Sequence, residues 1–297
     1  MTTSDAPYRR AVLVFNPHST GGAEQKAETL AGELASSAPW LTVDLVATEY
    51  AGHAREIAAK AARAADTLVV SVSGDGGFGE VVSGVMDATG GRCADTVVAV
   101  AAAGNANDHR RETRRRPLHE AIAAARPERL DLLRLDVDGE EPRWAHSYVG
   151  LGITPAVALE LEKGGKGSLR EVVTTVREFA RFHPFELVMG DGTRQHVDSL
   201  VFANVRSMAK YAELSSDGDP TDGAFEVVTI PHRSKLRMLA TAVRAAVRGL
   251  GPQPTAHRCT FTTTVPTPLQ LDGEVVELGA DRHVVVEIAP GALRTVR

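Results

Sequence analysis

The sequence predicts an α/β domain with a doubly wound parallel sheet, followed by a β-sandwich domain. Two observations support this fold class. Up to about Leu130, apolar runs alternate with helical patterns, as expected of βαβ units. Beyond that point, many short β-type runs are separated by turn signals, which is typical of a sandwich. We expect the boundary near Arg134, giving domains 1–134 and 135–297, with the last strand free to return to the first domain.

The first domain is expected to contain four strands, each followed by a helix. Bounded apolar runs that are rich in β-branched residues indicate the strands, and apolar residues at helical spacing indicate the helices. The expected strands are 11–15, 41–47, 67–73 and 97–100. The expected helices are 23–35, 54–65, 78–89 and 117–125.

The second domain is expected to be mostly strands with two helical interruptions. Asp-Gly pairs at 138–139, 191–192 and 272–273 mark hairpin turns. The expected strands are 133–137, 145–149, 185–189, 196–203, 225–230, 259–265, 269–271 and 283–288. The expected helices are 169–182 and 234–248, of which the second carries a basic face that could rest on a membrane or simply cover a sheet.

Composition excludes several classes of protein. The formal net charge of −5 argues against a nucleic-acid binder. The two cysteines, Cys93 and Cys259, fit a reducing compartment without a disulfide framework. No signal core opens the sequence, and no apolar run is long enough to span a bilayer. We therefore expect a cytoplasmic protein that is able to contact a membrane peripherally.

The loop Gly74–Gly79 lies between a buried strand and a helix, and it predicts a phosphate site. Its glycines allow a tight turn, and the helix start offers N–H groups to an anion. The Gly-x-Gly-x-x-Gly spacing matches the dinucleotide fingerprint, but Asp75 inside the loop would repel a bare pyrophosphate. The acid expected about 20 positions on would be Asp95, which precedes its strand. A nucleotide with a metal ion suits this loop better than a dinucleotide.

Two further polar loops follow predicted strands of the same sheet, at 16–22 and 103–108. Ligands of parallel sheets collect at the carboxyl ends of the strands, so we expect all three loops to converge on one crevice. Asn and Asp are also common in turns and helix caps. Either role suits the second loop by itself, and its place beside the Gly74 loop favours a binding wall.

Six blocks, in this order and spacing, resemble the diacylglycerol kinase catalytic family, which includes soluble bacterial lipid kinases, sphingosine kinases and ceramide kinases. The N-terminal blocks are Asn16-Pro17-x-Ser19, Ser73-Gly74-Asp75-Gly76-Gly77 and Gly104-Asn105-Ala106-Asn107-Asp108. The C-terminal blocks are Gly150-Leu151-Gly152, Asp219-Pro220-Thr221-Asp222-Gly223-Ala224-Phe225 and Asp272-Gly273-Glu274. Thr48 and Gly52-His53-Ala54 also match the family pattern.

The resemblance implies a two-domain kinase with the plan of NAD kinase, binding ATP and Mg²⁺. It implies Glu274 as general base, Asp108 as a second acid at the reacting centre, and Asp222 as a ligand of a structural Mg²⁺. The positions implied to contact the nucleotide are Asn16, Pro17, Ser19, Thr48, Ser73, Gly74, Asp75, Gly76, Gly77, Glu80, Gly104, Asn105 and Asn107.

The chain departs from the family pattern within the nucleotide loops. Ser73 stands where Gly is usual, Gly77 where Thr is usual, Gly79 where Asn is usual and Asn105 where Thr is usual. The loss of a hydroxyl at Gly77 removes one group that could hold a phosphate, while a backbone donor remains.

The sequence thus predicts an ATP-dependent lipid kinase that transfers the γ-phosphate to a lipid hydroxyl, such as that of diacylglycerol. Phosphoryl transfer depends on positioning and charge neutralisation, which the loops and acids could supply. The expected partners are ATP, a lipid acceptor and an anionic membrane surface, without nucleic acid, and a homodimer stays open. The alternatives are a kinase of NAD or another small molecule, and a nucleotide- or lipid-binding protein without activity.

Basic residues cluster at Arg110–Arg116, between the loop 103–108 and the expected helix 117–125. These arginines could attract a nucleotide phosphate or an anionic membrane surface. They could equally form a solvated loop in which Glu112 and Glu120 balance the charge. The sequence leaves both interpretations open.

Overall fold

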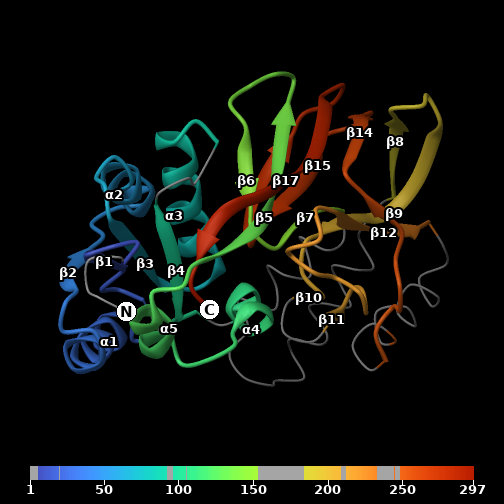
Figure 1. Ribbon diagram of the computed structural model, residues 1–297. Helices are drawn as coiled ribbons and strands as arrows, with labels where there is room; N and C mark the ends of the chain where they lie inside the picture. The colour runs from blue at the N-terminus through green and yellow to red at the C-terminus, as the bar shows by residue number, and fades with distance from the viewer. Residues whose placement is uncertain are drawn as a thin grey trace, which may run out of the picture. The chain divides into compact units, whose positions relative to one another are not determined.

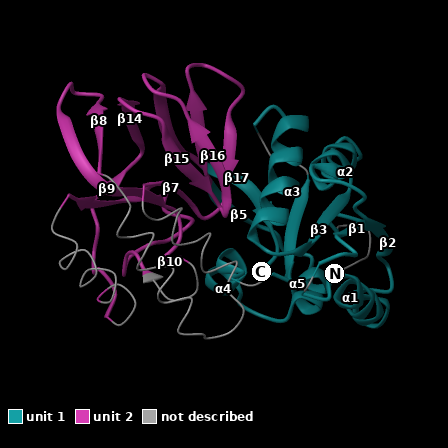
Figure 2. Cartoon of the chain, turned by 180° about the vertical axis from the view of Figure 1, so that it is seen from behind, with its two compact units in different colours: residues 1–131, 290–297 teal, residues 132–289 magenta. Residues whose placement is uncertain are grey.

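The structure is a computed structural model that describes residues 6–19, 21–91, 96–104, 106–152, 184–208, 212–232, 244 and 248–297. The chain divides into two compact units (Figure 2). Unit 1 comprises Met1–Asp131 and Pro290–Arg297, and unit 2 comprises Leu132–Ala289.

Unit 1 is built on a parallel sheet. Its strands are β1 (Arg10–Phe15), β2 (Thr42–Ala47), β3 (Thr67–Ser73) and β4 (Val97–Ala102). Strand β1 lies between β2 and β3, and β4 follows on the other side of β3. The register pairs Leu13 with Val70, and Val70 with Ala99. All four carboxyl ends therefore lie along one edge of the sheet.

The helices of unit 1 cover both faces of this sheet (Figure 1). They are α1 (Ala23–Ser37), α2 (His53–Ala62), α3 (Asp75–Ala88), α4 (Asp108–Thr113) and α5 (Leu118–Ala124). Alternate residues of β1, β3 and β4 share one core with α1 and α5, while α2 and α3 lie together on the opposite side. The predicted doubly wound α/β fold is confirmed.

Two close backbone contacts explain glycines in this unit. A Cβ on Gly84 of α3 would lie 2.1 Å from the carbonyl oxygen of Arg55 in α2, and one on Gly21 would lie 1.8 Å from that of Ala103. Since no side chain fits at such separations, these glycines set how closely α3 approaches α2, and how closely the loop after β1 approaches the end of β4.

The last residues of the chain join unit 1. Strand β17 (His283–Thr295) begins in unit 2, and its Thr295 pairs in parallel with Val98 of β4. The N–H of Gly291 donates to the Asp131 carboxylate at 2.6 Å, and Arg297 bonds to Glu128 at 2.7 Å. These contacts attach the end of the chain to the sheet that carries the three loops.

Unit 2 is rich in antiparallel strands. They are β5 (Glu128–Val137, which starts in unit 1), β6 (Arg143–Ala145), β7 (Tyr148–Gly152), β8 (Phe185–Met189), β9 (Arg194–Ala203), β10 (Ser207–Met208), β11 (Ala212–Glu213), β12 (Phe225–Pro231), β13 (Thr255–Ala256), β14 (Arg258–Thr263), β15 (Thr267–Leu271), β16 (Glu274–Leu278) and most of β17. The main path runs β16-β15-β7-β9-β8-β14-β17. Phe202 and Phe261 of this path are buried in one core with Phe225 of β12. The predicted β-rich second part is confirmed.

Two local predictions differ from the structure. The expected single strand 145–149 is two strands, β6 and β7, because the chain turns at His146–Ser147 to present its N–H groups to Asp272. The basic stretch expected as a possible loop begins as helix α4, whose first N–H groups meet Asp75. In both places an acid distant in the sequence decides the local structure.

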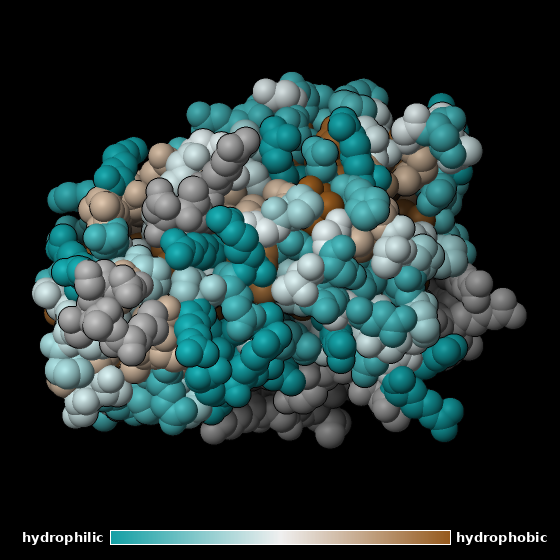
Figure 3. Space-filling model, viewed as in Figure 1, coloured by the Kyte–Doolittle hydropathy of each residue, from teal (hydrophilic) through white to brown (hydrophobic). Residues whose placement is uncertain are grey.

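Two predicted features concern membranes. The expected helix 169–182 lies outside the described residues, as does 234–248 except for Arg244 and Arg248. None of the helices in the described part of the chain is long and apolar enough to cross a membrane. The face of the molecule in Figure 3 is predominantly hydrophilic. The large apolar side chains exposed in the described ranges are Leu45, Tyr50 and Val265.

Candidate functional site

Three loops at the carboxyl ends of β1, β3 and β4 lie side by side in unit 1. The N–H of Ala103, after β4, donates to the Ser73 carbonyl at the end of β3 at 2.8 Å. A Cβ on Gly104 would lie 2.3 Å from the Cα of Gly74, so the two loops touch through their backbones. Lys26 of α1 donates to the Ala102 carbonyl at 2.9 Å. This bond connects the helix that follows the β1 loop to the end of β4. The loops predicted to converge on one crevice are therefore neighbours.

The Gly74 loop leads directly into helix α3, which starts earlier than expected, at Asp75. Phe78 donates its N–H to the Gly74 carbonyl at 3.1 Å, so the amides of Gly76 and Gly77 precede this first helical bond. Such amides, together with the helix dipole, favour an anion at the N-terminus. Gly76 is exposed, and a Cβ there would meet nothing within 4 Å.

Ser73 and Gly77 form a packed pair inside this loop. A Cβ on Gly77 would lie 2.7 Å from both Cβ and Oγ of Ser73. The Ser73 hydroxyl donates to the Gly74 carbonyl at 2.9 Å and lies 2.6 Å from the Ser71 hydroxyl. The two departures from the family pattern therefore compensate each other sterically, since the side chain at 73 occupies space that a side chain at 77 would need.

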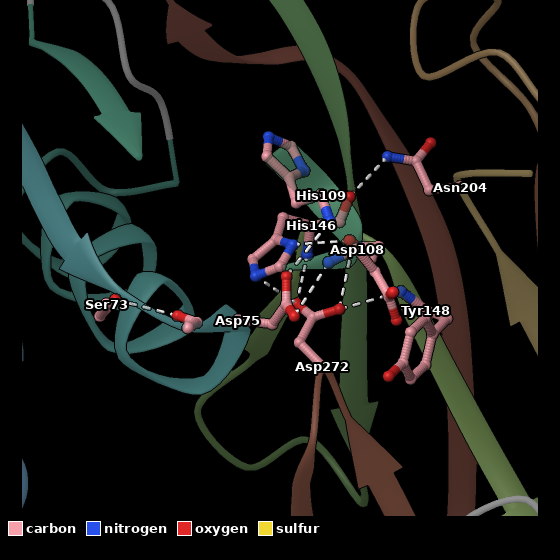
Figure 4. A network of polar contacts seen from close by, with 10 residues as sticks. Ser73, Asp75, Asp108, His109, His146, Tyr148, Asn204 and Asp272 are labelled. Atoms are coloured by element: carbon pink, nitrogen blue, oxygen red, sulfur yellow. Dashed lines mark hydrogen bonds and ion pairs between the residues drawn. The ribbon is translucent and has the colours of Figure 1, made fainter. Parts of the chain in front are cut away.

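Asp75 connects the Gly74 loop to helix α4. Its Oδ2 accepts the N–H of Asp108 at 3.0 Å, and its Oδ1 accepts the N–H of His109 at 3.2 Å (Figure 4). The His109 ring packs against Phe78 of α3 with centroids 4.9 Å apart. The Asp75 carboxylate thus caps the start of α4. Asp75 therefore anchors α4 to the Gly74 loop, a role that the sequence did not indicate.

The loop after β4 is shaped by Asn107. Its backbone has a left-handed φ of 54°, its side-chain oxygen accepts the Gly104 N–H at 2.9 Å, and its amide donates to the Gly104 carbonyl at 2.8 Å. Asp108, predicted at the reacting centre, is buried and lies 3.7 Å from Arg111. Asn105 lies outside the described residues.

The remaining predicted nucleotide positions lie around the same strand ends. The side-chain oxygen of Asn16 accepts the His18 N–H at 2.9 Å, and the Ser19 N–H donates to the Asn16 carbonyl at 3.0 Å, so Pro17 sits in a closed turn. Thr48 follows β2, and its N–H donates to the Phe15 carbonyl at 2.8 Å. Glu80 is half-buried on α3.

Unit 2 contains the predicted metal ligand, Asp222, in an exposed turn where its carboxylate accepts the Ala224 N–H at 2.9 Å. No group of three or more metal-ligating side chains forms among the residues that the structure describes. Negative charge is nevertheless concentrated nearby. Burial raises the pKa of Glu226, and the charges of Asp222 and Asp217 raise it further. A cation at this turn would relieve that repulsion.

The turn that carries Glu274 is anchored by its neighbour Asp272. The buried Asp272 carboxylate accepts N–H groups from His146 at 2.6 Å and from Ser147 and Tyr148 at 2.9 Å each (Figure 4). Glu274 itself is exposed at the start of β16. The sequence pointed to Glu274 and missed Asp272, whose left-handed φ of 46° within an Asp-Gly pair suggests only a turn.

The Asp272 anchor extends into a buried polar network within unit 2. The Nε2 atom of His146 lies 3.3 Å from the Asp272 carboxylate, and its Nδ1 lies 2.8 Å from the Ser147 hydroxyl. Asn204 donates to the His146 carbonyl at 3.2 Å. Burial raises the pKa of Asp272, although His146 and the three N–H groups oppose the shift. These contacts hold the bend between β6 and β7 against the turn that carries Glu274.

Comparisons with known proteins bear on the family and the fold. Residues 10–135 match the family model of the diacylglycerol kinase catalytic domain. A protein of Stenotrophomonas maltophilia (strain K279a) named "Probable lipid kinase YegS-like" is 26% identical over 185 residues, which are 58% of this chain and 59% of the relative. This match thus spans less than two thirds of the relative's length.

Solved structures share the fold over nearly the whole chain. The crystal structure of a diacylglycerol kinase from Bacillus anthracis str. Sterne matches with a TM-score of 0.69 and 13% identity, covering 97% of each chain. A second structure from that organism matches with a TM-score of 0.76 and 16% identity, covering 100% of this chain and 97% of the other. The fold class is confirmed, and the resemblance to the diacylglycerol kinase catalytic family is confirmed by the family match.

Proposed function

We propose, from the match of residues 10–135 to the diacylglycerol kinase catalytic domain, that this chain transfers the γ-phosphate of ATP to a lipid hydroxyl. The observation that supports this most is the convergence of three loops beside the N-terminus of α3 in unit 1. The proposed acceptors are lipids with a free hydroxyl group, of which diacylglycerol is the example. Because such an acceptor resides in a bilayer, the proposal includes peripheral contact with a membrane surface.

The nucleotide phosphates would lie at the start of α3. Backbone N–H groups at a helix N-terminus neutralise phosphate charge without reorganising during the reaction. The amides of Gly76 and Gly77 would supply these donors, and the exposed backbone at Gly76 allows close approach. The Asn16 and Gly104 loops would form the sides of the site, with Thr48 at its edge.

Two metal roles follow from this chemistry. ATP enters as its Mg²⁺ complex, which offsets charge on the phosphates. A second, structural Mg²⁺ would be held at the Asp222 turn, where Asp217 and Glu226 concentrate negative charge. Removal of the cation would restore that repulsion and loosen the turn that precedes β12.

Glu274 is proposed as the general base that takes the proton of the acceptor hydroxyl. It is exposed, which leaves it accessible to a substrate, and the Asp272 anchor fixes its turn. General-base catalysis by a positioned carboxylate contributes roughly 10²–10⁴-fold. Asp108 would contribute its buried charge near the loop after β4.

Transfer of label from ATP tests the proposal. Purified protein is incubated with Mg²⁺ and γ-labelled ATP in the presence of diacylglycerol, sphingosine, ceramide, NAD or no acceptor. We expect label in a lipid product. Label in NAD would instead establish the NAD kinase alternative. ATP binding by calorimetry without transfer to any lipid, while a known lipid kinase works in the same assay, would establish a binding protein.

A further inference from the structure

Arg110 on helix α4 is a buried cation. Its residue is 7% exposed, and its guanidinium donates one hydrogen bond, to the Arg116 carbonyl at 3.0 Å. No other nitrogen of this side chain is both sealed in the interior and without a partner. The remaining N–H groups are therefore not fully sealed from solvent, although the residue as a whole is buried.

Two acids near this stretch, Asp108 and Glu128, are paired with other arginines. Asp108 lies 3.7 Å from Arg111, and Glu128 lies 3.6 Å from Arg115. In the described part of the chain, no carboxylate forms an ion pair with Arg110. The charge of Arg114, which is also positive, acts on Arg110.

The environment of Arg110 disfavours its charge. Burial, assisted by repulsion from Arg114, lowers the pKa of Arg110 to about 10. The side chain is still protonated at neutral pH. Buried charges are normally paired, since an uncompensated one is strongly destabilising. An anion that binds here would supply the missing counter-charge.

We propose that Arg110 and Arg114 form a phosphate-binding site on helix α4. A guanidinium presents a planar fork of N–H donors that suits the oxygens of a phosphate. Arg110 and Arg114 are four residues apart, and neither has an ion-pair partner among the described residues, so together they suit an anion of more than one negative charge. The site goes beyond the proposed function, which assigns the nucleotide phosphates to the N-terminus of α3. Its phosphate could belong to a nucleotide or to a lipid head group.

Thermal unfolding in inorganic phosphate tests the site without any turnover. Wild type, Arg110→Gln and the exposed control Arg63→Gln are titrated with phosphate at constant ionic strength. We expect a saturable rise of Tm in wild type and Arg63→Gln, and loss of most of that rise in Arg110→Gln. Without phosphate, Arg110→Gln should be at least as stable as wild type, because it removes a buried charge.

Two further variants keep the test decisive if Arg110→Gln folds poorly. Arg114→Gln changes an exposed residue and should weaken phosphate binding several-fold, by about tenfold at most. Arg110→Lys keeps the charge but loses the fork, and should also bind phosphate more weakly. An equal Tm rise in all the variants, or no saturable rise in wild type, would overturn the proposal.

The source of the phosphate is identified by two binding measurements. Weaker ATP binding in Arg110→Gln by calorimetry assigns the site to the nucleotide. Weaker sedimentation with phosphatidylglycerol vesicles, with phosphatidylcholine vesicles as the reference, assigns it to a lipid head group. If phosphate binds but no lipid is phosphorylated, the site stands and the kinase proposal fails, so the two are separable.

Discussion

The Gly74 loop of unit 1 and the Asp272 turn of unit 2 each place an acid next to glycine after a strand, yet their neighbours differ. Asp75 accepts two backbone N–H groups from the start of α4, and Asp272 accepts three from the turn between β6 and β7. Asp272 is buried, whereas Glu274, two residues on, is exposed. In both regions the aspartate anchors another segment of its own unit.

This comparison separates acids that hold the fold from groups left to meet a ligand. An aspartate that accepts several N–H groups is committed to the backbone around it. The groups that stay available are the amides of Gly76 and Gly77 in one region and the Glu274 carboxylate in the other. Substitutions should therefore divide into those that change stability and those that change binding or transfer.

Asp272→Ala should have the largest effect on stability. It leaves three buried N–H groups without their acceptor and His146 without its partner, which should lower the free energy of unfolding by roughly 3–5 kcal/mol. Glu274→Ala, the matched exposed control, should change it by less than about 0.5 kcal/mol. Urea denaturation followed by the fluorescence of Trp144, in a Trp40→Phe background, measures unit 2. Equal midpoints for the two variants would contradict the anchoring role.

Asp75→Asn should have the next largest effect. An amide can accept only one of the two N–H groups well. The free energy of unfolding should therefore fall by about 1.5–3 kcal/mol, because the start of α4 is held less firmly. Because α4 follows the Gly104 loop, ATP affinity measured by calorimetry should also fall. The control is Asp87→Asn, on the same helix as Asp75, which alters an exposed ion pair with Arg55 of α2. If both variants bind ATP equally, Asp75 does not position the loop.

The Ser73–Gly77 pair offers a reversible test of the loop. Gly77→Ala should lower the free energy of unfolding by about 1–3 kcal/mol, because the new Cβ would overlap Ser73. Ser73→Gly in the same chain should restore stability by opening that space. Gly76→Ala, which meets nothing in the protein, should leave stability intact and weaken ATP binding. Failure of the double variant to recover in thermal unfolding would refute the steric coupling.

The smallest effect concerns pH. Burial raises the pKa of Glu226 above its ordinary value of 4.5, with Asp222 and Asp217 adding to the shift. At pH values between the ordinary pKa of the unfolded state and the raised pKa of the folded state, the folded state binds more protons than the unfolded state. The free energy of unfolding should therefore decrease as pH rises through that interval. Glu226→Gln should remove this part of the decrease, and Mg²⁺ should reduce it in wild type. Identical pH profiles would count against the charge cluster.

The sequence predicted elements that depend on local pattern and failed where distant residues decide. Bounded apolar runs located β1, β3 and β4, and glycines marked the loop between β3 and α3. The break between β6 and β7 was missed because its N–H groups bind Asp272, which is 126 residues away in the sequence from His146. Helix α4 was missed because its cap, Asp75, lies 33 residues before Asp108.

The candidate site shows the same division. Asn16, Gly74 and Gly104 could be placed together because parallel strands end at one edge of a sheet. Asp272 could not be distinguished from an ordinary hairpin residue, because its burial depends on how unit 2 folds over it. The charge of Arg110 was recognised in a basic stretch, but its burial was not.

The most direct test of the account compares Glu274→Gln with Glu277→Gln. Both change an exposed glutamate of β16, so both should fold and bind ATP like wild type. The measurement is transfer of label from ATP to a lipid acceptor. We predict that Glu277→Gln keeps transfer near the wild-type rate and that Glu274→Gln loses roughly 10²–10⁴-fold. Wild-type turnover in Glu274→Gln, or no lipid labelling by wild type, would contradict the account.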